Sequence, residues 1–293
     1  ATRQSLRSRV AGALLLTLLL SAGQRWVPPP RGTEAWFFSV GHGDAALVRG
    51  SRSALLIDAG TEPGPGRRGT VTRALDALRV RRLALLVVSH TDRDHRGGVP
   101  QILRTRPVDE LWLPPGGTRD PAFEAILRAA SARGCRIVER GLGDPAKSVG
   151  AMRVVPIWPP RRGGWRGATD NDRSLVVRVE HPRGALLFVG DLERAGEEAL
   201  LAAHWDRGPP LRAEVLKVGH HGSRSSSYSA FLRAVRPDHA VISAAEPARF
   251  GLPAPEVVER IAALGAHVHR TGPGALRIDL ERPWRVRGFR ENP

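Results

Sequence analysis

Short apolar runs alternate with helical patterns from Ala35 onward, and their order predicts the fold class. Early runs separated by turn residues predict a meander of strands, whereas later strands follow helical segments. The expected strands cover 35–40, 45–48, 54–57, 83–88, 110–113, 175–179, 185–189 and 213–218, and the expected helices cover 69–80, 99–104, 122–133 and 193–204. We therefore predict an α/β fold with two sheets covered by helices, a four-layer αββα sandwich formed by one domain over 31–293.

A basic and apolar segment at 1–30 precedes this domain. Three arginines lead into an apolar run at 10–23, which is shorter than the roughly 20 residues that span a bilayer. The run is compatible with a shortened final transmembrane helix, with the apolar region of a signal peptide or with a buried amphipathic start. We favour a membrane segment, followed by a stiff spacer of three prolines at 28–30. Because basic residues mark the cytoplasmic side of membrane segments, we expect the domain on the extracytoplasmic side of the cell membrane.

Basic residues exceed acidic ones, with 45 Lys and Arg against 29 Asp and Glu and a net charge of +16. This charge favours a polyanionic partner such as nucleic acid or a lipid headgroup surface. Lys147 and Lys217 are the only lysines, and in a chain rich in Ala, Gly and Pro the arginine bias can equally reflect GC-rich coding. Cys135 is the only cysteine, which excludes an intrachain disulfide and a cysteine-rich zinc site. Any metal must therefore be held by His, Asp, Glu or Asn.

The densest group of potential metal ligands lies directly after the predicted strand at 83–88. Four of them fall within six residues: His90, Asp92, Asp94 and His95. A loop that leaves a strand can turn so that alternate side chains converge on one point, as metal binding at about 2 Å per ligand requires. This segment is therefore the primary candidate for a metal site.

The segment resembles the HxHxDH metal motif of the metallo-β-lactamase superfamily, with Asp92 in place of the second histidine. Together with Val-Gly-His-Gly-Asp-Ala at 40–45, the HxDxDH pattern is similar to the C-terminal domain of ComEC-type DNA-uptake proteins, which act in competence. That family usually has Gln where this chain has His42, and it stays open whether His42 adds a ligand. The resemblance covers roughly 35–280 and implies a metallo-β-lactamase-type αββα fold.

Further segments resemble the other motifs of the superfamily, in the same order along the chain. The resemblance implies that Asp58, at a strand end, orients the metal ligands by hydrogen bonding. Asn171 and Ser174 lie in the place of the third-motif histidine, and since no histidine is present there we expect one metal position to be weakened or remodelled. Asp191, which ends a strand, matches a carboxylate that can bridge two metals.

The last motif is Lys-Val-Gly-His-His-Gly-Ser at 217–223, in which a histidine closes the metal site after a strand. The sequence does not distinguish His220 from His221, so both are candidate ligands. Ser223 is a candidate to donate a hydrogen bond to a phosphate oxygen.

The implied ligand set contains more carboxylates and fewer imidazoles than the superfamily pattern. Such a set is harder, which shifts the metal preference from Zn²⁺ toward Mn²⁺, which we favour, or Mg²⁺, in a site for one or two ions. Asp94 and Asp92 are the candidate catalytic residues, because either carboxylate could accept a proton from an activated water. No small organic cofactor is expected.

The resemblance and the charge together favour a nuclease that cleaves one strand of incoming DNA, beside a membrane-embedded channel in the same or an associated chain. The candidate DNA-binding residues are arginines in loops near the ligands: Arg161, Arg162, Arg166, Arg173 and Arg224. A hydrolase of a β-lactam, lactone or thioester is an alternative, because the fold alone does not determine the substrate. A non-catalytic DNA-binding module is a third possibility, supported by the missing third-motif histidine.

Overall fold

The computed structural model describes residues 30–161, 169–204, 211–245, 250–272, 274–281 and 284–289, and its strands form two sheets. The first sheet has eight strands in the order β15(Arg285–Phe289), β14(Ala275–Asp279), β1(Glu34–Phe37), β2(Ala46–Arg49), β3(Ala54–Ile57), β4(Leu85–Val87), β5(Glu110–Leu113) and β6(Arg136–Glu139). The second has seven, in the order β13(His267–Arg270), β12(His239–Ile242), β11(Val215–Lys217), β10(Gly184–Phe188), β9(Val176–His181), β8(Met152–Trp158) and β7(Lys147–Val149). Strands β3 to β6 and β10 to β13 are parallel, and the other pairs are antiparallel.

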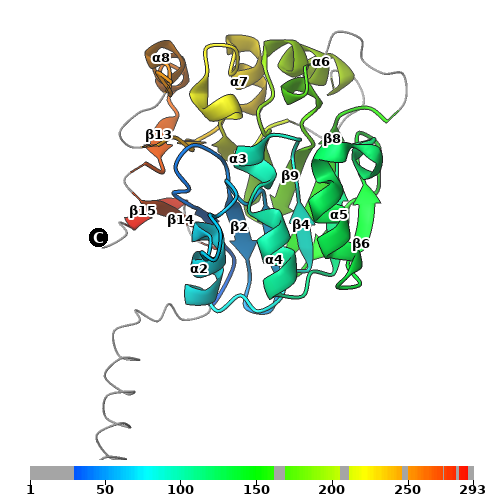
Figure 1. Ribbon diagram of the computed structural model, residues 1–293. Helices are drawn as coiled ribbons and strands as arrows, with labels where there is room; N and C mark the ends of the chain where they lie inside the picture. Colours follow the sequence, from blue (N-terminus) through cyan, green and yellow to red (C-terminus); the bar gives the residue numbers. More distant parts are fainter. Residues whose placement is uncertain are drawn as a thin grey trace, which may run out of the picture.

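Helices cover the outer face of each sheet, so the domain has four layers. The helices on the first sheet are α2(Thr70–Ala77), α3(Arg93–Arg96), α4(Val99–Thr105) and α5(Glu124–Ser131), and Figure 1 shows them in front of β2 and β4. Those on the second sheet are α6(Arg194–His204), α7(Ser229–Val235) and α8(Pro255–Ala262). The short 3-10 helices are η1(Gly117–Arg119), η2(Pro121–Phe123), η3(Asn171–Arg173) and η4(Gly219–Gly222).

Three apolar clusters fill the spaces between these layers. In β5, Leu111 and Leu113 pack under the helices of the first sheet, whereas Trp112 points between the two sheets. All three side chains are fully buried, and burying each contributes about 1.5–3 kcal/mol or more. The near-continuous apolar sequence of the central strands follows from this burial on both faces.

The predicted α/β fold with two sheets is confirmed, and most predicted elements match an observed one within a few residues. Two details of the prediction were wrong. The region at 136–158, left without strands, forms β6, β7 and β8. The segment after β4 was expected to be a loop, but it becomes helical at Arg93, so Asp94 and His95 project from α3. The proposed membrane segment at 10–23 lies outside the described residues, and within the described part of the chain no helix has the length and apolarity to cross a bilayer.

Candidate metal centre

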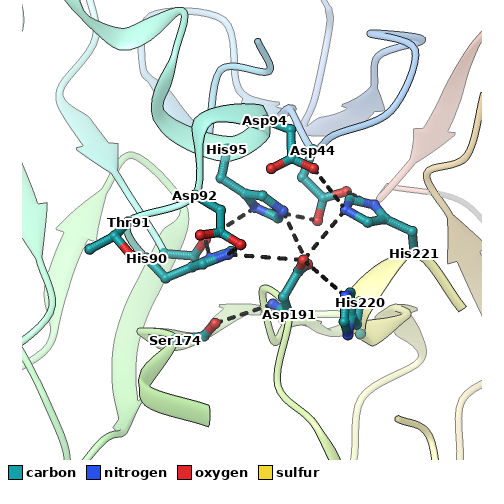
Figure 2. A network of polar contacts seen from close by, with 12 residues as sticks. Asp44, His90, Thr91, Asp92, Asp94, His95, Ser174, Asp191, His220 and His221 are labelled. Atoms are coloured by element: carbon teal, nitrogen blue, oxygen red, sulfur yellow. Dashed lines mark hydrogen bonds and ion pairs between the residues drawn. The ribbon is translucent and has the colours of Figure 1, made fainter. Parts of the chain in front are cut away.

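The candidate ligands meet at one edge of the two sheets, where parallel strands end (Figure 2). Asp58 follows β3 and His90 follows β4, which are neighbouring parallel strands of the first sheet. Asp191 follows β10 and His221 follows β11, which are neighbouring parallel strands of the second sheet. Because the carboxyl ends of parallel strands lie at the same edge, each sheet contributes side chains to one site.

Asp191 lies between two groups of potential ligands (Figure 2). On one side, His90 Nε2 is 3.6 Å from Asp92 Oδ2 and 3.9 Å from Asp191 Oδ2. On the other, His95 Nε2 is 3.0 Å from Asp191 Oδ1, and His221 Nε2 is 3.5 Å from Asp191 Oδ2. Because Asp191 belongs to both groups, its carboxylate would be a ligand for an ion held by either group.

Asp94 and His42 lie on the outer side of His221. The Oδ2 atom of Asp94 is 3.3 Å from His221 Nε2 and 3.6 Å from His42 Nε2. These three side chains form a further group within reach of one ion. The side chains of His42 and Asp94 are 28% and 21% exposed, so this group forms the rim of the centre. The structure thus brings His42 to the site, although the sequence left its contribution open.

The inward-facing atoms of the centre face one another and have no other polar partner. Among the described residues, the Nε2 atoms of His90, His95 and His221 and the Oδ1 atom of Asp191 are buried, and their polar contacts are the ion-pair contacts within the centre. Leaving a buried polar atom unpaired costs about 1–3 kcal/mol, and coordination to a cation removes that cost. Converging imidazole nitrogens and a carboxylate are suitable ligands for a divalent metal.

The opposite nitrogens of the same imidazoles are each held by a neighbouring group. The contacts are His90 Nδ1 to Ser89 Oγ at 2.9 Å, His95 Nδ1 to Asp58 Oδ2 at 2.8 Å, and His221 Nδ1 to the carbonyl oxygen of Ser243 at 3.1 Å. A proton held on Nδ1 leaves the lone pair of Nε2 available to a metal, which is the usual arrangement of ligating histidines. The residues present therefore fit a centre for divalent metal.

Asp58 fixes the start of the ligand segment. Its carboxylate accepts hydrogen bonds of 2.8 Å from the backbone N–H and from the hydroxyl of Ser89, in addition to the contact with His95. Asp58 is 1% exposed and has a φ of 56°, a left-handed conformation that costs a non-glycine residue about 1–3 kcal/mol. Asp58 thus lies where the resemblance placed it, in contact with a candidate ligand and with the loop that carries another.

The carboxylates of the centre raise the pKa values of two of its histidines, His95 and His221. Burial alone would lower the pKa of His95. Asp191 and Asp58 raise it by more than burial lowers it, so the pKa lies well above its usual range. Burial likewise disfavours the charged form of His221, and Asp191 again reverses the effect and raises the pKa. Burial raises the pKa of Asp191, but His95 and His221 hold it well below the usual range. Without metal, protons on these imidazoles therefore balance the buried carboxylate.

A buried ion pair lies beneath the centre and was missed by the sequence analysis. Lys217 Nζ pairs with the carboxylate of Asp44 and donates a 2.8 Å hydrogen bond to the carbonyl oxygen of Val218. Asp44 Oδ1 is 3.4 Å from His221 Nδ1. Lys217 and Asp44 are 3% and 5% exposed, and although burial opposes ionisation of Asp44, Lys217 holds its pKa well below the usual range. The signal available in the sequence was a lysine at a strand end in a chain with 43 arginines and one other lysine, Lys147.

The two adjacent histidines have different positions. His221 is fully buried and points to the centre, whereas the side chain of His220 is 27% exposed. His220 Nε2 is 4.0 Å from Asp191 Oδ2, and its Nδ1 is 3.1 Å from Glu193 Oε1. Both histidines have left-handed backbone angles, with φ of 45° and 52°, and these angles turn them toward the same carboxylate. The structure thus favours His221 as a main ligand and places His220 outside the ligand groups, between Asp191 and Glu193.

The region of the third motif contributes through a serine rather than through a metal ligand. Ser174 Oγ accepts a 3.2 Å hydrogen bond from the backbone N–H of Asp191 (Figure 2). Asn171 lies in η3 and makes no side-chain contact to the candidate ligands among the described residues. Its neighbour Asp172 is buried and accepts hydrogen bonds from the backbone of Gly196 and Glu193, near the start of α6. Ser223 lies beside the centre, with its hydroxyl 3.0 Å from that of Ser225.

Three of the five candidate DNA-binding arginines lie in the described part of the chain, and each has a carboxylate within 4 Å. Arg161 pairs with Asp144 at 3.1 Å, and Arg224 pairs with Glu256 at 2.5 Å. Arg173 is exposed and lies 3.9 Å from Asp170. The other two candidates, Arg162 and Arg166, lie outside the described residues.

The geometry agrees with comparison to known proteins. A model of the metallo-beta-lactamase superfamily matches residues 39–246, which is more than half of the chain, and the chain belongs to this superfamily. Two solved structures share the fold at 17% sequence identity. They are the metallo hydrolase Igni18 from Ignicoccus hospitalis KIN4/I, with a TM-score of 0.51 over 84% of this chain and 99% of that one, and the diiron β-hydroxylase CmlA from Streptomyces venezuelae, with 0.56 over 90% and 55%.

The named relatives are competence proteins, as the motifs predicted. The chain is 35% identical over 257 residues to competence protein ComA of Neisseria gonorrhoeae and 29% identical over 255 residues to ComE operon protein 3 of Bacillus subtilis (strain 168). These matches cover 87% and 81% of this chain but 33% and 32% of the relatives. The chain therefore spans about a third of the length of these curated relatives.

We predict that His221→Ala weakens divalent metal binding much more than His220→Ala, because only His221 lies buried between Asp94 and Asp191. Isothermal titration with Mn²⁺ should give a dissociation constant raised by more than about 100-fold for His221→Ala, exceeding the 10- to 100-fold typical of supporting residues. The exposed His267 on β13 provides the control variant His267→Ala, expected to bind like the wild type. Equal losses for the His220 and His221 variants would contradict this assignment.

We also predict that metal binding strengthens as pH rises. Because Asp191 raises the pKa of His95 and His221 in the metal-free protein, both imidazoles carry protons near neutral pH and must lose them to bind a metal. Affinity should rise by about one log unit per pH unit for each proton released between about pH 6 and pH 8. Titrations in buffers of different ionisation enthalpy should show proton release, and pH-independent binding without release would contradict the prediction.

Proposed function

We propose that this chain carries an extracytoplasmic, metal-dependent nuclease domain over 31–293 that cleaves one strand of DNA entering through a DNA-import channel. The observation that carries the proposal is the Asp191-centred site with Asp92 in place of an imidazole, in a chain similar to competence proteins. The channel would be part of the same longer protein or of an associated chain. The arginines before the apolar run at 10–23 support the extracytoplasmic placement.

The ligand set supports a hard divalent ion. Three carboxylates, from Asp92, Asp94 and Asp191, face the inward nitrogens of three histidines. Carboxylate oxygen is a harder donor than imidazole nitrogen, so we favour Mn²⁺, with Mg²⁺ or Zn²⁺ as alternatives. Hard ions bind phosphoryl oxygens well, which agrees with a phosphodiester substrate.

The residues of the centre have distinct tasks in the proposed reaction. A divalent ion bound there would lower the pKa of water and polarise a phosphoryl oxygen. Asp92 is the better placed carboxylate to accept a proton from water, because its side chain is 51% exposed and that of Asp94 is 21% exposed. The neighbouring imidazole of His90 holds the pKa of Asp92 below its ordinary value, so this carboxylate is ionised at neutral pH. Asp94 instead positions His221.

We predict that the full chain, loaded with Mn²⁺, cleaves linear DNA and that Asp94→Asn reduces the rate by about 10- to 100-fold, because Asp94 positions His221. Release of fluorescent fragments from a labelled oligonucleotide measures the rate. The same preparation is tested on a β-lactam and on a thioester reporter, and His267→Ala serves as the control variant. Turnover of either reporter with intact DNA would contradict the nuclease proposal.

We further predict that wild-type protein turns over DNA faster with Mn²⁺ than with Zn²⁺, and that Asp92→His narrows or reverses this order. The reason is that the variant replaces an oxygen donor beside His90 with a softer nitrogen donor. Asp92→Glu keeps the oxygen donor and is the matched control, expected to retain the wild-type order of metals. The same metal ranking in wild type and Asp92→His would show that ligand hardness does not determine the preference.

A further inference from the structure

A cleft lined by arginines lies next to the metal centre. This cleft of about 350 Å³ opens between the start of α6, the loop before α7, α7 itself and α8. Four arginines line it: Arg194, Arg224, Arg233 and Arg260. Tyr228, the only tyrosine of the chain, also lines the cleft and is partly exposed.

The cleft is joined to the metal centre through a single loop. Ser225 lines the cleft, and its hydroxyl is 3.3 Å from His220 Nδ1 and donates a 2.9 Å hydrogen bond to Glu193. The backbone N–H of Arg194 donates to the carbonyl oxygen of Ser225 at 2.6 Å. His220 in turn lies 4.0 Å from Asp191. A polymer bound across the metal centre on the His220 side would therefore continue into this cleft.

The arginines of the cleft have donors available for an anion. Arg194 and Arg224 each use Nε in an ion pair, with Glu198 at 2.8 Å and with Glu256 at 2.5 Å, and each guanidinium has four further N–H donors. Arg233 is exposed and has no ion pair or hydrogen bond among the described residues. The cleft thus has four guanidinium groups, of which those of Arg194 and Arg224 pair with a glutamate. Guanidinium groups pair bidentately with phosphate, so the chemistry fits a phosphate backbone.

Tyr228 adds a flat surface to this charged cleft. The guanidinium of Arg194 lies 5.6 Å from the centroid of the Tyr228 ring. Buried Glu197 anchors the loop, since its carboxylate accepts hydrogen bonds from the backbone N–H groups of Ser227 at 2.6 Å and Tyr228 at 2.9 Å. A ring held in place beside cationic groups is the arrangement on which unpaired nucleobases stack in proteins that bind single strands.

We propose that this cleft binds the nucleotide next to the cleaved phosphodiester of a single DNA strand. Arg194, Arg224 and Arg233 bind its phosphate, and Tyr228 stacks on its base. Arg260, which donates a 2.9 Å hydrogen bond to the carbonyl oxygen of Ser227, holds the loop in position. This inference rests on the proposed nuclease function and adds to it a preference for an unpaired strand.

The test compares two substrates of the Mn²⁺-loaded full chain: a labelled single-stranded oligonucleotide and bis-p-nitrophenyl phosphate, a small phosphodiester without a neighbouring nucleotide. Tyr228→Ala should weaken oligonucleotide binding by about 5- to 150-fold, the range of one stacked base, and leave its salt dependence unchanged. Tyr228→Phe keeps the ring and should bind like the wild type. Arg233→Glu should weaken binding and reduce the slope of log affinity against log salt by about 0.7 for the lost contact.

Controls separate this inference from the nuclease proposal. For Tyr228→Ala and Arg233→Glu, the loss of kcat/KM on the oligonucleotide should exceed the loss on the small phosphodiester by at least about tenfold. Arg104→Glu makes the same charge change at an exposed position of α4, on the other helical layer, and should bind DNA like the wild type. Wild-type DNA binding by both cleft variants, in a protein that cleaves DNA, would overturn the cleft assignment alone. A wild-type protein that cleaves neither substrate would overturn the nuclease proposal itself.

Discussion

Asp191 places a carboxylate that is 2% exposed at the point where imidazoles from both sheets converge. A buried carboxylate is costly unless it is paired with positive charge, so its partners must be present whenever the domain is folded. His95 lies on α3, which follows β4 of the first sheet, and His221 lies on η4, which follows β11 of the second sheet. The edges of the two sheets must therefore keep a fixed position relative to each other. The buried apolar strands between the helical layers hold the two edges in place, and the ligands lie just beyond the ends of these strands.

Burial changes gradually across the centre, and this gradient decides from which side a substrate can approach. Asp44, Asp58 and His95 form a closed floor, where each carboxylate has a fixed hydrogen-bonded partner. Asp92 and His220 are on the open side, together with the rim formed by His42. The closed floor fixes the positions and ionisation of the buried side chains. The side chains on the open side are partly exposed and can still bind a substrate. Chemistry on a large polymer requires this division, because only the outer half of the site can be shared with a substrate.

Much of the site could be predicted because its ligands are close in sequence. His90, Asp92, Asp94 and His95 fall within six residues, and the other motifs each follow an apolar strand. The partnership of Asp44 with Lys217 could not be predicted, because it joins positions 173 residues apart in different sheets. The choice between His220 and His221 depends on two left-handed backbone angles that no hydrophobic pattern encodes. The strands β6 and β7 were missed because each has only three or four residues and contains charged ones. The longer, largely apolar β8 was present in the hydrophobic pattern and was overlooked.

The ion pair of Lys217 has a consequence for how the protein matures. It supplies a permanent positive charge to Asp44, and protons on His95 and His221 supply positive charge to Asp191, so these two buried carboxylates have positive partners before any ion arrives. Folding therefore need not wait for metal, in contrast to small domains that are unfolded without it. A chain of this kind can be assembled first and metallated afterwards. The ligands can then select among the ions that the folded domain meets, and metal selection is separated in time from folding.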